Sequence, residues 1–409
     1  MNIVLEPGAA ALLDELHRAG FGAYAVGGCV RDSLLGLAPH DWDLCTAARP
    51  GQVMELFGED RCIPTGLQHG TVTVKRDGKL YEVTTFRTEG RYSDGRHPDS
   101  VAFVPDLRED LARRDFTINA MAYSAEEGLC DPFGGREDLA RGVVRAVGEP
   151  LRRFGEDALR ILRLYRFAAR FGFAIDEATE AAAKQLASHL DCVSAERIEE
   201  ELNKLLAAPQ PGAYLEPEVL AFVLPELPPE ELTKARRRID ALPAGTEQVS
   251  ARWAALLLPL GETGARKALK RLKCSNARID GAAALVRECG EKTPDTLDKC
   301  DLRLQAKRLL GKYDLHTVQQ LTALWTALAP EEKASFDALR AEAEALTAQG
   351  TCCRISQLAV NGRDLMAAGA APGPGLRRVL EALLEEVITG RLPNEKTELL
   401  AFAAGFSAS

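Results

Sequence analysis

The spacing of hydrophobic positions changes once along the chain, close to Gly148. Before that point, short apolar runs alternate with polar residues and glycines, which is the pattern of strands and short helices. The pattern predicts strands over residues 23–26, 40–46, 71–75 and 80–86, and helices over 10–18 and 30–35. Asp77-Gly78 separates the last two strands and is a good hairpin signal. The first part of the chain is therefore predicted to be a mixed α/β region.

After Gly148 the hydrophobic spacing becomes that of helices and stays so to the end of the sequence. Ala, Leu, Glu, Lys and Arg dominate, and strand patterns disappear. Proline-rich segments at 209–217, 225–229 and 371–375 interrupt the helical pattern. We therefore expect an α+β fold, in which a head with a mixed sheet and helices is followed by an all-helical remainder.

Composition adds three constraints. The sequence has 409 residues, of which 46% are hydrophobic and 27% charged, as in ordinary globular proteins. No apolar run reaches the roughly 18 residues of a membrane span, and the first residues, MNIVLEPGAA, do not resemble a secretory signal. The ten cysteines lack Cys-x-x-Cys spacing, which indicates reduced core thiols and not a zinc or redox site. We expect a cytoplasmic protein with no membrane partner and no obligate protein partner.

Two aspartates, Asp41 and Asp43, lie two positions apart in the predicted strand 40–46. Residues two apart on a strand point to the same side, so the two carboxylates are expected to share one face. Two neighbouring carboxylates repel each other unless a cation lies between them. Mg²⁺ is commonly bound by one or two carboxylates together with substrate phosphates. The pair indicates a magnesium site, although an isolated Asp-x-Asp pattern is more often a solvated strand face.

Gly27 and Gly28 connect the first predicted strand to a helix that carries Arg31. Without side chains they let backbone N–H groups approach a triphosphate, and the helix N-terminus favours negative charge. Glu82 is a candidate third carboxylate, because two-metal phosphoryl transfer needs ligands for both ions. An outward-facing, solvated Glu82 is the alternative. The order of these features along the chain favours a nucleotide-binding site more than any one of them does.

Taken together, these segments resemble the class II tRNA nucleotidyltransferases, the CCA-adding enzymes, which share a polymerase-β-like head with bacterial poly(A) polymerases. The matching segments stand in the family's order at 27–32, 41–43, 113–120, 131–135, 156–160 and 360–365. The resemblance is strongest over residues 20–175. It implies a catalytic head at 1–147, a neck with a base-reading helix at 148–207, a body at 208–330 and a tail at 331–409 that binds the tRNA elbow.

The resemblance implies template-independent addition of CCA to the 3′ end of tRNA from CTP and ATP. The tRNA 3′ hydroxyl would attack the α-phosphate and release pyrophosphate. Asp41 and Asp43 would hold the Mg²⁺ ions with Glu82 nearby, while Gly28 and Arg31 would contact the triphosphate. One ion would lower the pKa of the attacking hydroxyl, and the other would stabilise the leaving pyrophosphate.

For the nucleotide itself, the resemblance assigns five more residues. Arg114 would bind the nucleotide and discriminate its ribose. Asp157 and Arg160 would read the base, and Arg163 and Arg166 would complete the pocket. Cytosine and adenine each offer an amine donor beside a ring-nitrogen acceptor, which suits a carboxylate next to a guanidinium. Guanine and uracil present the opposite polarity and would leave buried polar groups unpaired.

The proposed base-reading helix can be tested against helical geometry. At about 100° per residue, Arg160, Arg163, Arg166 and Arg170 fall on one side. The apolar residues of the opposite side are expected to pack on a core; they are Ala158, Ile161, Leu162, Tyr165, Ala168 and Ala169. The alternative for the arginines is a solvated basic face. Four arginines, with no lysine among them, favour directed contacts to phosphates and bases.

Other activities remain open to different degrees. A poly(A) polymerase would carry an arginine-rich stretch where residues 63–72 stand, and a CC-adding enzyme would lack part of the loop that 87–98 resembles. An A-adding enzyme stays open. A His-Asp phosphohydrolase is rejected, because His189 and His316 are not followed by Asp. A non-catalytic RNA-binding module would have no need of the carboxylates.

The net charge of −9 and the pI of about 5.4 argue against a nucleic-acid partner unless basic residues are clustered. Two clusters exist, at 234–238 and at 266–273. On one helix, Arg266, Lys270 and Lys273 would align as a basic stripe suited to a phosphate backbone. Solvated faces balanced by nearby acids are the alternative for each cluster.

Overall fold

The computed structural model describes residues 3–90, 100–291 and 301–406. The chain forms two compact units, and each is described by itself. The first contains the chain up to Pro229 together with Arg271–Lys273, and the second contains Glu230–Lys270 and the chain from Cys274 onward. In the described ranges, no helix is both long enough and apolar enough to cross a membrane.

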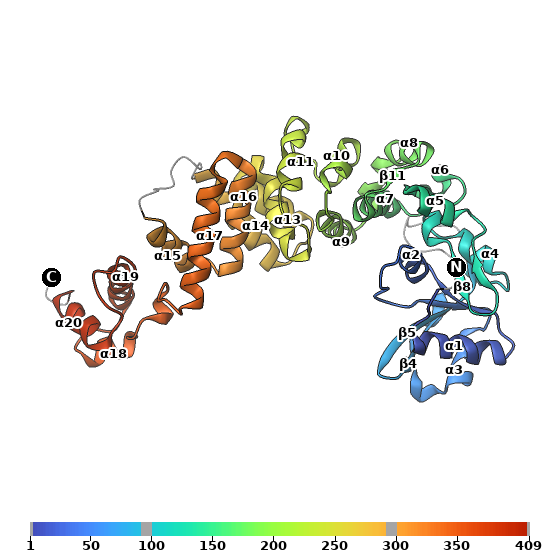
Figure 1. Ribbon diagram of the computed structural model, residues 1–409, viewed down its shortest axis with the longest axis horizontal. Coiled ribbons are helices and arrows are strands. Elements are labelled where there is room, and N and C mark those ends of the chain that lie inside the picture. Colours follow the sequence, from blue (N-terminus) through green and yellow to red (C-terminus); the bar gives the residue numbers. More distant parts are fainter. Residues whose placement is uncertain (1–2, 91–99, 292–300, 407–409) are drawn as a thin grey trace. The chain divides into compact units, whose positions relative to one another are not determined.

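The first unit is built around a seven-stranded sheet with the order β3-β4-β5-β2-β1-β8-β9 (Figure 1). The strands are β1 (Ala23–Val26), β2 (Leu44–Thr46), β3 (Cys62–Gly66), β4 (Thr71–Arg76), β5 (Lys79–Thr85), β8 (Ala122–Ser124) and β9 (Gly128–Cys130). β2 and β5 are parallel, and the other neighbouring pairs are antiparallel. Two small ladders pair β6 (Arg87–Glu89) with β7 (Val101–Phe103), and β10 (Val143–Val144) with β11 (Ala174–Ile175). The predicted mixed sheet is confirmed.

The β4–β5 hairpin forms where Asp77-Gly78 predicted it. Asp77 and Gly78 have φ values of 50° and 74°, as a tight hairpin turn with two left-handed central residues requires. The prediction of a strand over 40–46 is wrong at its start, because β2 begins only at Leu44. Aspartate is depleted in strands, and the acidic segment before Leu44 stays irregular. Asp41 and Asp43 therefore lie in the loop that enters β2.

Two helices, α1 (Pro7–Arg18) and α3 (Pro50–Phe57), pack against the sheet and lie on the same side of it in Figure 1. On β5, Tyr81 and Thr85 are buried, and the Tyr81 hydroxyl donates to Glu6, the residue before α1, at 2.5 Å. Because side chains alternate along a strand, Glu82 points the other way, and it is exposed. The sheet therefore has a second, more open side on which Glu82 lies.

Further helices complete the first unit: α2 (Gly28–Leu34), α4 (Leu107–Ala112), α5 (Gly135–Arg141), α6 (Pro150–Glu156), α7 (Leu159–Phe171), α8 (Glu177–Gln185), α9 (Ala195–Leu206) and α10 (Pro217–Val223). α7 packs against α6 and α9. Its predicted apolar side is buried at every one of the six positions. The prediction that strands end at Gly148 is wrong only for the two residues of β11, which extend the β10 ladder.

The second unit is helical throughout its described residues, as predicted. Its helices are α11 (Leu232–Asp240), α12 (Val249–Leu257), α13 (Gly261–Arg271), α14 (Asn276–Glu291), α15 (Leu302–Lys312), α16 (Leu315–Leu328), α17 (Lys333–Ala348), α18 (Gly362–Ala367), α19 (Pro374–Ile388) and α20 (Lys396–Phe406). α16 packs between α14 and α17 (Figure 1). The last three helices share a small apolar core that includes Leu365, Leu383 and Leu399.

Candidate active site

Two of the predicted carboxylates, Asp43 and Glu82, lie side by side where β2 pairs with β5, and the charge of Asp41 also acts on Asp43. β2 and β5 run parallel, with Leu44 opposite Val83. One position earlier, the same register places Asp43 beside Glu82. Asp41, Asp43 and Glu82 are all exposed. The fold thus brings together acids that are about 40 residues apart in the sequence.

The Asp43 carboxyl has a pKa above its ordinary value. Desolvation by the surrounding protein contributes most, followed by the negative charge of Glu82; Arg114 opposes the shift, and Asp41 adds to it. The ionised form of Asp43 is therefore under-compensated by the protein alone. A bound cation would supply the missing positive charge.

A divalent cation fits this set of donors in charge and in ligand type. Carboxylate oxygens are hard ligands, and Mg²⁺ commonly completes its shell with substrate phosphates and water. The Asp41 carboxylate lies 3.0 Å from His40 Nδ1, and its side chain is 83% exposed. Within the described part of the chain, no group of three or more His, Cys, Asp or Glu side chains is arranged to bind a metal ion by itself. The cluster therefore suits a cation that brings phosphate ligands with it.

The turn before α2 depends on Gly27. Its φ is 76°, and a Cβ at this position would lie 2.9 Å from Arg114 Nη1. Arg114 is held from the other side by Asp110, whose Oδ2 is 3.4 Å from Nη2. Gly28, at the start of α2, keeps part of its surface exposed. The predicted phosphate-binding turn and Arg114 are therefore adjacent, and both lie near Asp43.

Arg31 is arranged differently from the other predicted nucleotide-binding residues of this turn. Its side chain is only 4% exposed, and Nη1 donates to Asn119 Oδ1 at 2.5 Å. Nε donates to Asp32 at 2.8 Å. Burial lowers the pKa of Arg31, and the charge of Asp32 opposes that shift. These contacts use only part of the five N–H donors of the guanidinium, and Nη2 lies 3.6 Å from the Cβ position of Gly28.

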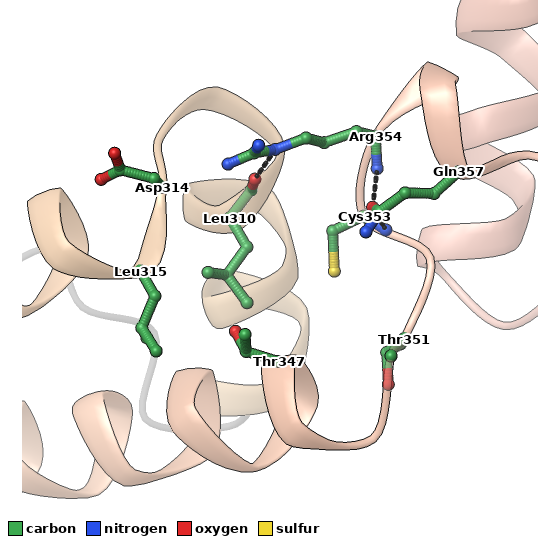
Figure 2. A pocket seen from close by; sticks show the side chains of 9 residues that line it. Leu310, Asp314, Leu315, Thr347, Thr351, Cys353, Arg354 and Gln357 are labelled. Atoms are coloured by element: carbon green, nitrogen blue, oxygen red, sulfur yellow. Dashed lines mark hydrogen bonds between the residues drawn. The ribbon is translucent and has the colours of Figure 1, made fainter.

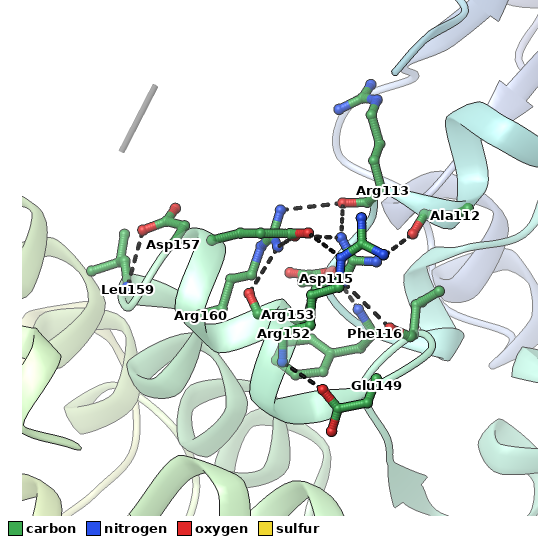
Figure 3. A network of polar contacts seen from close by, with 12 residues as sticks. Ala112, Arg113, Asp115, Phe116, Glu149, Arg152, Arg153, Asp157, Leu159 and Arg160 are labelled. Atoms are coloured by element: carbon green, nitrogen blue, oxygen red, sulfur yellow. Dashed lines mark hydrogen bonds and ion pairs between the residues drawn. The ribbon is translucent and has the colours of Figure 1, made fainter. Parts of the chain in front are cut away.

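Asp157 and Arg160 lie together at the start of α7, and each already has protein partners (Figure 3). The Asp157 carboxylate accepts from the Leu159 N–H at 3.0 Å and pairs with Arg197 of α9 at 2.8 Å. Arg160 Nη1 donates to Glu156 at 2.8 Å, and the residue is 8% exposed. The two side chains are thus held in fixed orientations by neighbouring charges.

Two arginines donate hydrogen bonds to one backbone carbonyl, which lies between α4 and the 3₁₀ turn at Thr117–Asn119. The Arg113 carbonyl accepts from Arg153 at 3.1 Å and from Arg160 at 3.2 Å (Figure 3). Arg153 also donates to the Ala112 carbonyl at 2.6 Å. Arg114, the next residue, therefore has its backbone fixed relative to Arg160.

The later arginines of α7 also pair with acids. Arg163 donates to Asp115 through Nε at 2.9 Å and Nη2 at 2.5 Å, and Arg166 lies 2.5 Å from Glu201 of α9. Burial alone would raise the pKa of Asp115, but Arg163 and Asn119 hold it well below its ordinary value. The alternative of a solvated basic face is therefore wrong for Arg160 and Arg166, which are buried.

The acids that hold these arginines were not predicted from the sequence. Asp115 and Glu156 lie inside the segments 113–120 and 156–160, where an acid close to arginines was a usable signal. Glu201 and Arg197 lie on α9, and no local pattern connects them with α7. Asp110, which is fully buried beside Arg114, was also missed.

The predicted basic stripe in the helical region is only partly formed. Arg266 pairs with Glu262 at 3.0 Å and with Asp280 at 2.6 Å, so its charge is balanced. Lys273 lies beyond the end of α13 and has φ 61°, so the prediction of one helix carrying all three residues is wrong. Lys270 is exposed, as expected.

Two other predicted segments have structural counterparts. The loop at 87–98 begins as β6, which pairs with β7; residues 91–99 lie outside the described residues. In the segment 360–365, Asn361 caps α18 by accepting from Arg363 and Asp364 N–H groups, and Asp364 accepts from the Asn361 N–H at 2.9 Å. This reciprocal cap explains the polar residues of that segment without a ligand.

A cavity of about 250 Å³ lies elsewhere, in the second unit, between the ends of α15 and α17 and the start of α16 (Figure 2). Arg354 donates from Nε to the Leu310 carbonyl at 2.8 Å, and Gln357 accepts from the Cys353 N–H at 2.9 Å. These hydrogen bonds satisfy a backbone carbonyl at the end of α15 and a backbone N–H in the turn that follows α17. The cavity has no cluster of carboxylates comparable to that on the sheet.

Three families of protein domains match parts of this chain. Residues 23–145 match the poly A polymerase head domain family. Residues 172–228 match the probable RNA and SrmB-binding site of polymerase A, and residues 245–403 match a putative tRNA nucleotidyltransferase domain 2.

Full-length similarities are also present. A CCA-adding enzyme of Latilactobacillus sakei is 40% identical over 402 residues, covering 96% of both chains. One of Geobacillus stearothermophilus is 38% identical over 402 residues, covering 96% of this chain and 95% of the other. The crystal structure of the Bacillus stearothermophilus CCA-adding enzyme in complex with CTP aligns with a TM-score of 0.81 and 34% identity. That alignment covers 99% of this chain and 98% of the other.

Proposed function

This chain belongs to the family of CCA-adding enzymes, and we propose that the open side of its sheet and the start of α7 divide the catalytic work between them. It is a tRNA nucleotidyltransferase that adds CCA to the 3′ end of tRNA from CTP and ATP without a template. Like the rest of its family it depends on a divalent metal, which we propose is Mg²⁺.

Asp41 and Asp43 would hold the metal, with Glu82 beside them. When bound there, a divalent metal would supply positive charge for activating the attacking hydroxyl and for neutralising the phosphates. The pKa of the Asp43 carboxyl is raised first by desolvation and then by the charge of Glu82, and a bound cation would offset both effects.

The triphosphate is proposed to lie against the Gly27–Gly28 turn. The Gly27 N–H already donates to the Met121 carbonyl at 3.1 Å, so the backbone N–H groups proposed to face the phosphates are those from Gly28 onward, at the start of α2. Arg114 adds a positive charge from the adjacent segment. Arg114 is anchored by Asp110, so its guanidinium is oriented before the nucleotide binds. Its position beside the turn also suits the proposed contact with the ribose.

The base is proposed to be read by Asp157 and Arg160. Arg197 and Glu156 hold these two side chains by ion pairs. Because the two side chains cannot reorient, a mismatched base would leave hydrogen-bonding groups unpaired. Arg163 and Arg166 would complete the pocket from their ion-paired positions on α7. The fixed Asp-Arg pair is the observation that carries the proposal of a protein template.

The remainder of the chain is proposed to bind tRNA. Residues 148–207 would serve as the neck, 208–330 as the body and 331–409 as the tail. The exposed Lys270 would contact the phosphate backbone, and Arg266 and Lys273 are further candidates for such contacts. Such contacts read shape and charge, not sequence. The expected cytoplasmic location would give access to tRNA and nucleotides.

A product analysis tests the function directly. tRNA transcripts lacking one, two or three terminal residues are each offered CTP, ATP, UTP or GTP singly and then in a mixture, and the products are sequenced. In the mixture, a CCA-adding enzyme extends each substrate to CCA and stops; with one nucleotide at a time it adds only the C or A residues that come next in CCA. Addition of A alone, of CC alone, or of a long A tail would instead identify an A-adding enzyme, a CC-adding enzyme or a poly(A) polymerase.

A further inference from the structure

Arg31 packs α2 against α7. Removing a guanidinium from water is costly unless hydrogen bonds and opposite charge replace the lost solvation. Besides Asp32 and Asn119, two aromatic rings of α7 contact Arg31: its Cζ is 5.2 Å from the centroid of Phe167 and 4.9 Å from that of Phe171. The two rings stack on each other at 6.3 Å. Arg31 therefore fixes the helix that starts at Gly28 against the base-reading helix.

Asn119 extends this contact to Arg163. Its Oδ1 accepts from Arg31, and its Nδ2 donates to Asp115 Oδ1 at 3.0 Å. The other carboxylate oxygen of Asp115 accepts from Arg163. An amide has one accepting and one donating end, so it satisfies a guanidinium and a carboxylate at once. A hydrogen-bonded path therefore runs from α2 to the middle of α7.

A second path runs through Asp32. One of its oxygens accepts from Arg31, and the other lies 3.1 Å from Arg170 Nη2, near the end of α7. The Arg170 guanidinium lies over the Phe171 ring, 4.9 Å from its centroid. Since Arg31 takes part in both paths, α2 is tied to α7 at two points, Arg163 and Arg170.

We propose that Arg31, Asn119 and Arg170 are positioning residues that hold α7 in a fixed position relative to the Gly27–Gly28 turn, and that this link sets base selectivity. The proposal rests on the function proposed above, in which the turn binds the triphosphate and α7 carries the base-reading residues. The base and the triphosphate are two ends of one molecule. If α7 shifts slightly relative to the turn, the triphosphate can still bind at the turn, but the base no longer aligns with the hydrogen-bonding groups of Asp157 and Arg160.

This role differs from a direct contact of Arg31 with the triphosphate, and the two make opposite predictions. A phosphate ligand, when removed, weakens every triphosphate equally and leaves the choice of base unchanged. A positioning residue, when removed, leaves the binding of phosphates unchanged and weakens the distinction between bases.

The test uses the full-length enzyme with the variants Asn119→Leu, Arg170→Gln and Arg31→Lys. Two quantities are measured: incorporation of UTP and GTP in competition with CTP on tRNA lacking CCA, and the inhibition constant of tripolyphosphate, which has no base. We expect misincorporation to rise about tenfold while the inhibition constant changes by less than about twofold. Arg170→Gln decides the outcome, because Arg170 lies near the end of α7 and pairs with Asp32, whereas the Asn119 carbonyl oxygen is 3.7 Å from the Cβ position of Gly27.

Two results would overturn the link. One is weaker inhibition by tripolyphosphate with unchanged selectivity, which would make Arg31 a phosphate ligand. The other is unchanged selectivity in Arg170→Gln. If Asn119→Leu does not fold, Arg170→Gln still decides, because the Arg170 side chain is 46% exposed and its loss leaves the core intact. Arg170→Lys, which can keep the ion pair, should retain the selectivity of the parent.

The double variant Asn119→Leu/Arg170→Gln sharpens the test, because two paths that hold the same helix should give non-additive losses of selectivity. Arg141→Gln is the control; this arginine of α5 is 59% exposed and pairs only at 3.7 Å with Glu137. A parent enzyme that adds neither CMP nor AMP would contradict the proposed function. A parent that adds both, with Arg170→Gln variants of unchanged selectivity, would contradict the link alone.

Discussion

The open side of the sheet and the helix α7 carry charge in opposite ways. On the sheet, Asp41, Asp43 and Glu82 are exposed acids close to one another, and desolvation together with the charges of Glu82 and Asp41 raises the pKa of Asp43. On α7, four arginines each pair with an acid, and Arg160 and Arg166 are buried. The negative charge on the open side of the sheet is only partly compensated by the protein, whereas the positive charge on α7 is balanced by acids of the protein itself.

The difference follows from what each region must do. A metal and a triphosphate arrive with large charges, so the acids that receive them gain from being unpaired beforehand. Base selection needs donors and acceptors in fixed positions, and side chains that are held by ion pairs keep their orientation. The following variants test whether the two regions differ in this way, from the largest expected effect to the smallest.

Asp43→Ala should lower the rate of CMP addition at saturating CTP by roughly 10³-fold, because charge neutralisation is the main source of catalysis here. The measurement is incorporation of labelled CMP into tRNA lacking CCA. Glu55→Ala, an exposed acid on α3, is the matched control and should be near normal. A near-normal rate in Asp43→Ala would remove the carboxylates from their assigned role.

Glu201→Ala should lower the free energy of unfolding of the first unit by about 3–5 kcal/mol, because it leaves the buried Arg166 without its acid. Glu200→Ala is the control on the same helix. Its acid is 63% exposed, and its pair with Lys204 should contribute no more than about 1 kcal/mol. Urea unfolding followed by circular dichroism compares the two, and equal losses would mean that α7 is not balanced by buried pairs.

Asp157→Ala should raise incorporation of UTP and GTP relative to CTP by about 10- to 100-fold, with little change in inhibition by tripolyphosphate. The physical reason is that the amine acceptor is lost while the phosphate-binding turn is untouched. A competition assay with all four nucleotides measures it, with the exposed Asp191→Ala as control. Retained selectivity would exclude Asp157 from base reading.

Asp43→Asn should raise the Tm of the metal-free protein slightly at neutral pH. The folded-state pKa of Asp43 is raised, so its ionised form opposes folding above that pKa, and the effect disappears below the ordinary aspartate pKa of about 4. Adding Mg²⁺ should raise the Tm of the parent and leave that of Asp43→Asn nearly unchanged. Thermal unfolding at several pH values, with and without Mg²⁺, measures both effects. A lower Tm for Asp43→Asn without metal would show that the acids are compensated by the protein.

Local pattern determined much of the fold. The change from sheet to helix near Gly148, the Asp77-Gly78 hairpin and the apolar spacing of α7 are properties of short stretches of sequence, and these were predicted correctly. The order of the glycine, aspartate and arginine segments was enough to indicate the family. The start of β2 was misplaced, because strand ends depend on which backbone groups find partners.

The tertiary structure decided which charges are paired. Helical spacing located the arginine side of α7, but it could not show whether water or acid covers that side. Arg163 meets Asp115 from 48 positions away, and Arg31 meets Asn119 from 88 positions away. A buried guanidinium is stable only where the fold brings a partner to it. The sequence thus determined where the arginines and aspartates stand, and the packing of distant segments determined which of them are free to meet a nucleotide.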